Sequence, residues 1–131
     1  MKNVKKNNKG FSLVELIVVV MIMAIIAVAL APQVMKWVNN SRQATDVQTI
    51  DALVSACQLA CTNKDYATTD KKFTFDSSTR KITLGTSGYE KVVADYLGQS
   101  TVELLSDINA TVTVTKGVVT KTITGMSSDI E

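Results

Sequence analysis

The sequence GFSLVELIVVVMIMAIIAVALA, residues 10–31, organises the whole chain, because it joins a basic leader to a long apolar run. As a helix, residues 11–31 extend for roughly 30 Å, which is the thickness of a bilayer's hydrocarbon core. Lys36 and Arg42 follow the run, whereas four lysines precede it, namely Lys2, Lys5, Lys6 and Lys9. Because positive charge stays inside, we expect a single membrane crossing with a cytoplasmic N-terminus.

One acid, Glu15, interrupts the apolar run near its start. A carboxylate at mid-bilayer costs about 2.5 to 3.5 kcal/mol, so Glu15 needs either a shallow depth or a cationic partner. If a protease cut after Gly10, Phe11 would carry a new α-amino group with a pKa of about 7.7 to 8.0, one helical turn before Glu15. That amine could be neutralised by the acid of its own chain or by that of a neighbouring chain.

The residues around this acid resemble the type III signal of type IV prepilins and the related pseudopilins. The resemblance covers about residues 1–45 and is carried by the basic leader, by the apolar run and by the ordered residues Gly10, Phe11, Ser12, Leu13, Val14 and Glu15. It implies that a prepilin peptidase cuts after Gly10 and methylates Phe11. By the same resemblance, Glu15 registers each subunit against its neighbour during assembly, and Pro32 falls where many pilins carry a proline.

The resemblance also implies a function and a set of partners. We expect a structural subunit of a type IV pilus, which polymerises with itself into a helical filament and supports adhesion, motility or DNA uptake. The implied partners are the prepilin peptidase, an assembly ATPase and a membrane platform protein. The precursor is expected to cross the cytoplasmic (inner) membrane once before assembly, and the mature chain to lie in an extracellular pilus.

Other interpretations of the same residues remain open at this point. Within the family, the chain could be a pseudopilin of a type II secretion or competence machine. Outside it, the chain could be a membrane-tethered extracytoplasmic binding module. A plain anchor leaves the acid of the apolar run unexplained, and a cleaved secretory peptide has a shorter apolar core with its cleavage site after that core.

We expect an α+β fold built on one long helix. Residues 1–10 form the cleaved leader, 11–35 the transmembrane and filament-core half of the helix, and 36–131 the extracytoplasmic domain. Residues 32–61 contain no glycine, and the helical pattern continues to about Cys61. Residues 37–43 are polar nearly all round and should stand free in a monomer. An apolar stripe beyond them predicts packing against a sheet, and consists of Val47, Ile50, Val54, Cys57 and Cys61, widened by Leu53 and Ala60.

From Lys71 onward the period of the apolar residues changes to two. Residues 71–84 predict one β-hairpin around a polar turn, and residues 109–125 predict a second hairpin around Gly117. Between the hairpins, residues 89–107 predict a short helix, a break at Gly98 and a second helical or irregular segment. The expected domain is therefore a helix packed on a mostly antiparallel sheet of about four strands.

The composition argues against an enzyme, a cofactor, a metal site and nucleic acid as a direct partner. The 131-residue chain has no histidine and a formal charge of +2, and removal of the four leader lysines leaves the mature form slightly acidic. The one basic cluster, Lys71, Lys72, Arg80 and Lys81, is expected to be a solvated face. Cys57 and Cys61 are spaced for neighbouring positions on a helix, where Cβ atoms lie too far apart for a disulfide, so we expect buried thiols, with a bridge possible only if the last helical turn opens.

Overall fold

The computed structural model describes residues 10–127, so the leader lysines lie outside the described residues. The α+β fold is confirmed. The chain divides into two compact units, Met1–Lys36 and Trp37–Glu131. The elements, in chain order, are α1 (Leu13–Cys61), β1 (Lys71–Phe75), β2 (Lys81–Thr83), α2 (Gly88–Leu97), β3 (Thr101–Glu103), β4 (Asn109–Thr115) and β5 (Val118–Thr124).

The first unit consists of the apolar part of α1. Every described residue from 10 to 36 is exposed, including large side chains such as Leu13, Ile25 and Val28. This part of α1 is long and apolar enough to cross a membrane. The helix continues through Pro32, which supplies no backbone N–H to the helical hydrogen bonds.

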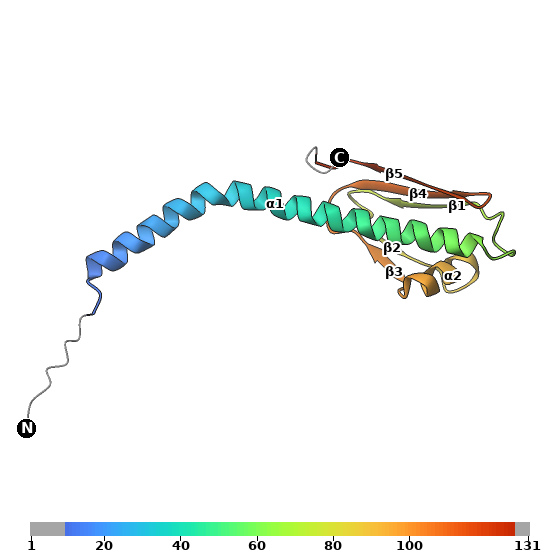
Figure 1. Ribbon diagram of the computed structural model, residues 1–131, viewed down its shortest axis with the longest axis horizontal. Coiled ribbons are helices and arrows are strands. Elements are labelled where there is room, and N and C mark those ends of the chain that lie inside the picture. The colour runs from blue at the N-terminus through green and yellow to red at the C-terminus, as the bar shows by residue number, and fades with distance from the viewer. Residues whose placement is uncertain (1–9, 128–131) are drawn as a thin grey trace, which may run out of the picture. The chain divides into compact units, whose positions relative to one another are not determined.

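The second unit contains two antiparallel sheets. One sheet has the strand order β1-β4-β5, and the other consists of β2 and β3. In Figure 1 the three-stranded sheet runs along one side of the second part of α1, and β2, β3 and α2 lie along the other side. The prediction of about four strands is therefore corrected, since residues 10–127 contain five strands in two sheets, all paired in an antiparallel sense.

The core of this second unit forms between α1 and the inner sides of both sheets. Ile50 and Leu53 of α1 are fully buried, as are Phe75 of β1 and Val112 of β4, and Val102 of β3 is almost fully buried. Burying one such side chain contributes about 1.5 to 3 kcal/mol, so a handful of them supplies most of the attraction that holds the helix to the sheets.

The buried stripe of α1 is shifted slightly from the predicted stripe. Four of the predicted residues are buried, namely Ile50, Leu53, Cys57 and Ala60, whereas Val47, Val54 and Cys61 are only half-buried. Asp46 and Ala56 are buried in addition. The buried positions still recur at steps of three and four, as one helical face requires. The shift centres the face on small residues, which let the backbone of α1 approach its neighbours closely.

The second predicted hairpin is confirmed. β4 and β5 pair along their whole length, from Asn109 opposite Thr124 to Thr115 opposite Val118. The turn between them is Lys116–Gly117, and both residues have positive φ, as a two-residue type I′ turn requires. A Cβ on Gly117 would also lie 2.8 Å from the carbonyl oxygen of Ala67, so glycine is needed here for space as well as for conformation.

The first predicted hairpin is wrong, although its turn forms. Asp76 and Thr79 exchange two backbone hydrogen bonds of 3.3 and 3.1 Å, which close a tight turn. Beyond the turn the strands separate, since β1 pairs with β4 and β2 pairs with β3. The alternation of apolar residues determines which face of a strand is buried, but it does not select the neighbouring strand.

After Gly98 the helical alternative of the prediction is wrong, whereas residues 104–108 are irregular, as the other alternative predicted. Gly98 ends α2 in the left-handed conformation, and the backbone N–H of Gln99 donates to the carbonyl of Ala94. Residues 101–103 then form β3 and not a second helix. Three residues are too few to show a periodic pattern, and the burial of Val102 opposite Ile82 of β2 holds this strand in place.

Asp46 fastens the loop after β3 to α1. Its side chain is fully buried, and its Oδ1 accepts a hydrogen bond of 2.7 Å from the backbone N–H of Leu105. Its Oδ2 accepts one of 2.8 Å from the N–H of Ser106, and also accepts the Ser106 hydroxyl. Each acceptor therefore has a donor, which is the condition for tolerating a buried carboxylate.

Replacing this carboxylate by an amide tests its contribution. Asp46→Asn keeps the shape but turns one acceptor toward the Ser106 donors into a donor, so we expect the unit to lose about 2 to 4 kcal/mol of stability. Urea denaturation of the full chain in detergent measures this loss. The control is Asp51→Asn, which removes an exposed ion pair with Lys121 and should cost at most about 1 kcal/mol. Equal effects of both variants would contradict the assignment.

Candidate functional site

The start of α1 carries the residues that the sequence singled out. Gly10 and Phe11 are exposed and lie outside the helix, which begins at Leu13 and not at Phe11 as predicted. Phe11 is 94% exposed. The peptide bond between Gly10 and Phe11 therefore lies in a non-helical, exposed segment of the described chain, where another protein can reach it.

Ser12 and Glu15 determine where the helix begins. The backbone N–H of Ser12 donates to Oε2 of Glu15 at 2.9 Å, and the N–H of Glu15 donates to Oγ of Ser12 at 3.2 Å. This reciprocal arrangement is a capping box, which satisfies two backbone donors at a helix N-terminus. An acid in the first turn is also favoured by the helix dipole. The helix thus stops before Phe11 for a reason encoded in the sequence.

The capping box leaves Glu15 able to bind a further donor. Only Oε2 accepts the Ser12 N–H, and a carboxylate has about four acceptor positions. Pairing with a cation and capping of the helix are therefore compatible. Glu15 therefore has a partner in its own chain, Ser12, which the interpretation of the sequence did not consider. The S-x-x-E spacing is the sequence signal that could have predicted it.

The fold itself gives no reason for glycine at position 10. A Cβ built on Gly10 meets no atom within 4 Å. Among the described glycines, Gly117 is held by both a positive φ and a close backbone contact, and Gly10 has neither. Within residues 10–127, therefore, neither the backbone conformation nor a close contact accounts for glycine at this position.

A second cluster joins the end of α1 to α2. The hydroxyl of Tyr89 donates to the carbonyl oxygen of Cys57 at 3.0 Å and lies 3.6 Å from Sγ of Cys61. The ring of Tyr66 contacts that of Tyr89 edge to face, with centroids 5.9 Å apart. Both thiols are free, and Cys57 is buried as predicted. Burial raises the pKa of Cys57 to about 11 and also raises that of Tyr89.

This cluster has the character of a packing contact and not of a reactive site. A thiol with a raised pKa remains protonated near neutral pH and is a poor nucleophile. Within residues 10–127, no group of three or more side chains is placed to bind a metal ion. The hydrogen bond from Tyr89 is instead an additional contact to a backbone carbonyl in the last two turns of α1, and it ties α2 to that helix.

The basic cluster of the sequence is dispersed in the structure. Lys71 pairs with Glu90 at 2.6 Å, Arg80 with Asp107 at 3.3 Å and Lys81 with Glu103 at 4.0 Å. The pKa of Glu90 is lowered by its bond to Lys71 and by the Gly85 N–H. Three of the four cations are thus matched by acids, and phosphate binding on one continuous basic face finds no support here.

Comparison with known proteins identifies the N-terminal segment. Residues 5–31 match the family described as the prokaryotic N-terminal methylation motif. The chain therefore carries the class III signal of type IV pilins and pseudopilins, followed by a long apolar helix. No curated protein and no solved structure is significantly similar to the chain.

Removal of the Ser12 hydroxyl tests the capping box. In Ser12→Ala the N–H of Glu15 loses its acceptor, and the first turn should lose about 1 kcal/mol of local stability. Amide hydrogen exchange of Glu15, measured by NMR in detergent micelles, should accelerate about five-fold. Ser41→Ala is the matched control, since the Ser41 side chain lies on the exposed face of α1. An unchanged exchange rate in Ser12→Ala would show that the box is not formed.

The raised pKa of Cys57 predicts slow alkylation. At pH 8, iodoacetamide should alkylate Cys57 far more slowly in the folded chain than in the urea-unfolded chain. In the folded chain the alkylation rate should rise with pH up to about 11. Because the folded state holds this proton more tightly, its contribution to stability is complete below the unfolded pKa and is lost as pH rises toward 11. Mass spectrometry after iodoacetamide treatment measures the rate, and rapid labelling at pH 8 would contradict the burial.

Proposed function

We propose that this chain, which carries the class III signal of type IV pilins and pseudopilins, is a structural subunit of a type IV pilus. The observation that carries the proposal is that residues 13–31 of α1 are apolar except for Glu15 and are exposed on every side. An apolar surface of this size is not stable in water and needs lipid or other chains around it. The same surface suits the bilayer before assembly and the interior of a filament afterwards.

Processing of the precursor is the first step of the proposed function. The prepilin peptidase removes residues 1–10 and methylates the new N-terminus at Phe11. The exposed, non-helical backbone at this bond supports the assignment, because a protease binds its substrate in an extended form. The absence of any intrachain contact at Gly10 is consistent with a requirement for glycine that the peptidase imposes.

Assembly is the second step, and it depends on the apolar half of α1. Subunits leave the cytoplasmic membrane and place this helix among those of their neighbours, with the assembly ATPase and the platform protein as partners. Repetition of one contact without closure gives a helical polymer. Glu15 pairs with the Phe11 amine of a neighbour and sets the register, and Pro32 lies where the apolar half ends. Adhesion, motility or DNA uptake would follow from the assembled fibre.

The direct test is to shear filaments from cells and sequence the N-terminus of their main component. We expect long fibres composed mostly of this chain, beginning at methylated Phe11. Chains in fibres that still begin at Met1 would refute the processing step. A trace amount in short fibres of a secretion or competence machine would instead identify a pseudopilin.

Substitution of the acid separates processing from assembly. Glu15→Val makes the helix a better membrane span, so we expect normal insertion and cleavage but at least a ten-fold lower yield of sheared fibres, since docking loses a charge pair of a few kcal/mol. The control Gly10→Val should fail one step earlier, because the added side chain obstructs the peptidase, and should accumulate uncut. Normal fibre yield in Glu15→Val would contradict the role of this acid, and mature chain in Gly10→Val would contradict the cleavage site.

A further inference from the structure

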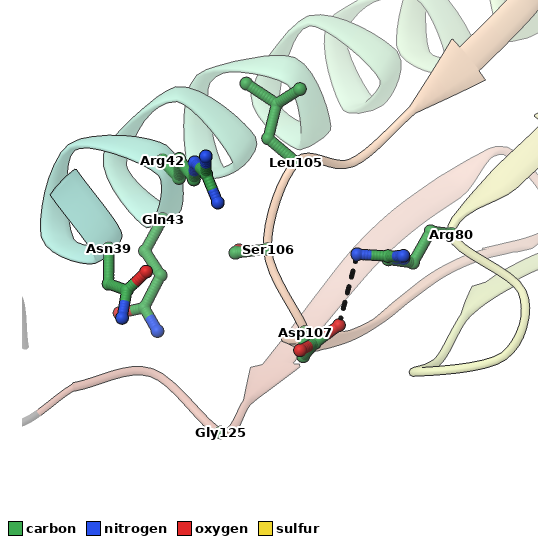
Figure 2. Close-up of a pocket in the computed structure, with 8 residues that line it drawn as sticks. All are labelled: Asn39, Arg42, Gln43, Arg80, Leu105, Ser106, Asp107 and Gly125. Atoms are coloured by element: carbon green, nitrogen blue, oxygen red, sulfur yellow. Dashed lines mark ion pairs between the residues drawn. The ribbon is translucent and has the colours of Figure 1, made fainter. Parts of the chain in front are cut away.

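The cavity at the end of the second unit nearest residue 37 is lined by two arginines. It has a volume of about 230 Å³, and its lining residues are Asn39, Arg42, Gln43, Arg80, Leu105, Ser106, Asp107 and Gly125. Figure 2 shows Asn39 and Gln43 extending from α1 on one side and Arg80 reaching from the other. The lining contains one carboxylate, Asp107, which pairs with Arg80, so it carries a surplus of positive charge.

The walls of this cavity are fixed by contacts already described. Leu105 and Ser106 donate three hydrogen bonds to the buried carboxylate of Asp46. Arg80 is held by Asp107 at 3.3 Å, and Gln43 accepts the Ser127 N–H at 2.9 Å. The cavity is therefore a formed recess of about the size of one side chain.

Arg42 is the lining cation that lacks a counter-charge. Within residues 10–127 it makes no ion pair and no side-chain hydrogen bond, whereas Arg80 has Asp107. A guanidinium group binds a carboxylate through two parallel hydrogen bonds, and such a pair is stronger than a lysine contact. The vacant position at Arg42 thus fits a carboxylate.

One acid of the described chain, Asp65, could supply this carboxylate. Between residues 10 and 127, every carboxylate except that of Asp65 accepts a hydrogen bond or pairs with a cation. Asp65 is exposed in the turn that follows α1. The last turn of α1 contains no basic residue, so the negative end of the helix dipole adds to the potential near this acid.

Arg42 and Asp65 cannot meet within one chain. From Arg42 to the end of α1 at Cys61 the helix rises for roughly 28 Å, and Asp65 lies beyond that end. The two charges therefore lie at opposite ends of the same unit, which is the arrangement of a head-to-tail contact between copies.

We propose that the Arg42 cavity of one copy receives Asp65 of a second copy. The proposal rests on the filament function above and adds a contact between the exposed units to the one between apolar helices. A neighbour displaced by one helical turn brings its Phe11 to Glu15, whereas only a copy displaced by about the length of the unit brings Asp65 to Arg42. The two contacts thus join each subunit to two different neighbours.

Charge exchange between the two positions tests the proposal in the full-length chain. Arg42→Glu and Asp65→Arg each place like charges together, and each should lower the sheared-fibre yield about ten-fold relative to total membrane protein. The double variant Arg42→Glu, Asp65→Arg restores opposite charges and should recover most of the yield. The milder Arg42→Gln should give an intermediate loss. Lys72→Glu is the control, since Lys72 is another exposed cation without an ion pair within residues 10–127, and it should leave the yield within two-fold.

Each other result overturns the pairing. Normal fibres in both single variants, a double variant no better than either, or an equal loss in Lys72→Glu would show that these charges do not meet. A loss in Arg42→Glu with normal fibres in Asp65→Arg would show that a different anion occupies the cavity. N-terminal sequencing confirms that the variants are cut and stable in the membrane. Failure of the unaltered chain to form fibres would refute the proposed function itself, whereas fibres that tolerate the exchanges refute only this contact.

Discussion

An apolar surface that water cannot solvate is the constraint on which the rest of the molecule depends. Residues 13–31 present branched and sulfur-containing side chains on every side of α1, and none of them is buried by its own chain. The free energy of exposing them is large at about 25 cal/mol per Å² of apolar area. Such a surface needs lipid or other protein chains around it, and the folded unit must keep its own core separate from it.

The folded unit meets this requirement by packing around the second part of α1, which is a continuation of the apolar helix. α1 continues from the apolar part into the second unit, where Ile50, Leu53 and Cys57 replace the all-round apolar pattern with a single buried stripe. Asp46 lies in the first turn of that stripe and ties the loop after β3 to it. Tyr89 bonds to the carbonyl of Cys57 near the other end. One helix thus supplies both the surface that needs partners and the support of a self-contained core.

The sequence predicted the parts whose signals are local and missed those that depend on distant partners. The long helix, the hairpin at Lys116–Gly117 and the end of α2 at Gly98 follow from periodicity and from turn chemistry, which act within a few residues. The pairing of β1 with β4 and the formation of β3 do not follow from such local signals, because they depend on packing between distant parts of the chain. The burial of Asp46 was missed because its carboxylate, which lies on the apolar face of the helix, is satisfied by backbone N–H donors about sixty residues away in the sequence. Residue order predicts a cleavage site after Gly10, and the capping box of Ser12 and Glu15 explains why the chain before Leu13 is not helical.

The way Asp46 joins α1 to the loop after β3 bears on how the unit carries mechanical load. A pull along a filament would enter each subunit through its helix, and the helix passes the force to the sheets through contacts that lie across its axis. The three hydrogen bonds that Leu105 and Ser106 donate to Asp46 are among the contacts that would bear such a force. Survival under a pull is governed by the rate of unfolding and not by equilibrium stability. In the proposed filament, the buried carboxylate would therefore contribute to tensile strength beside the apolar helix.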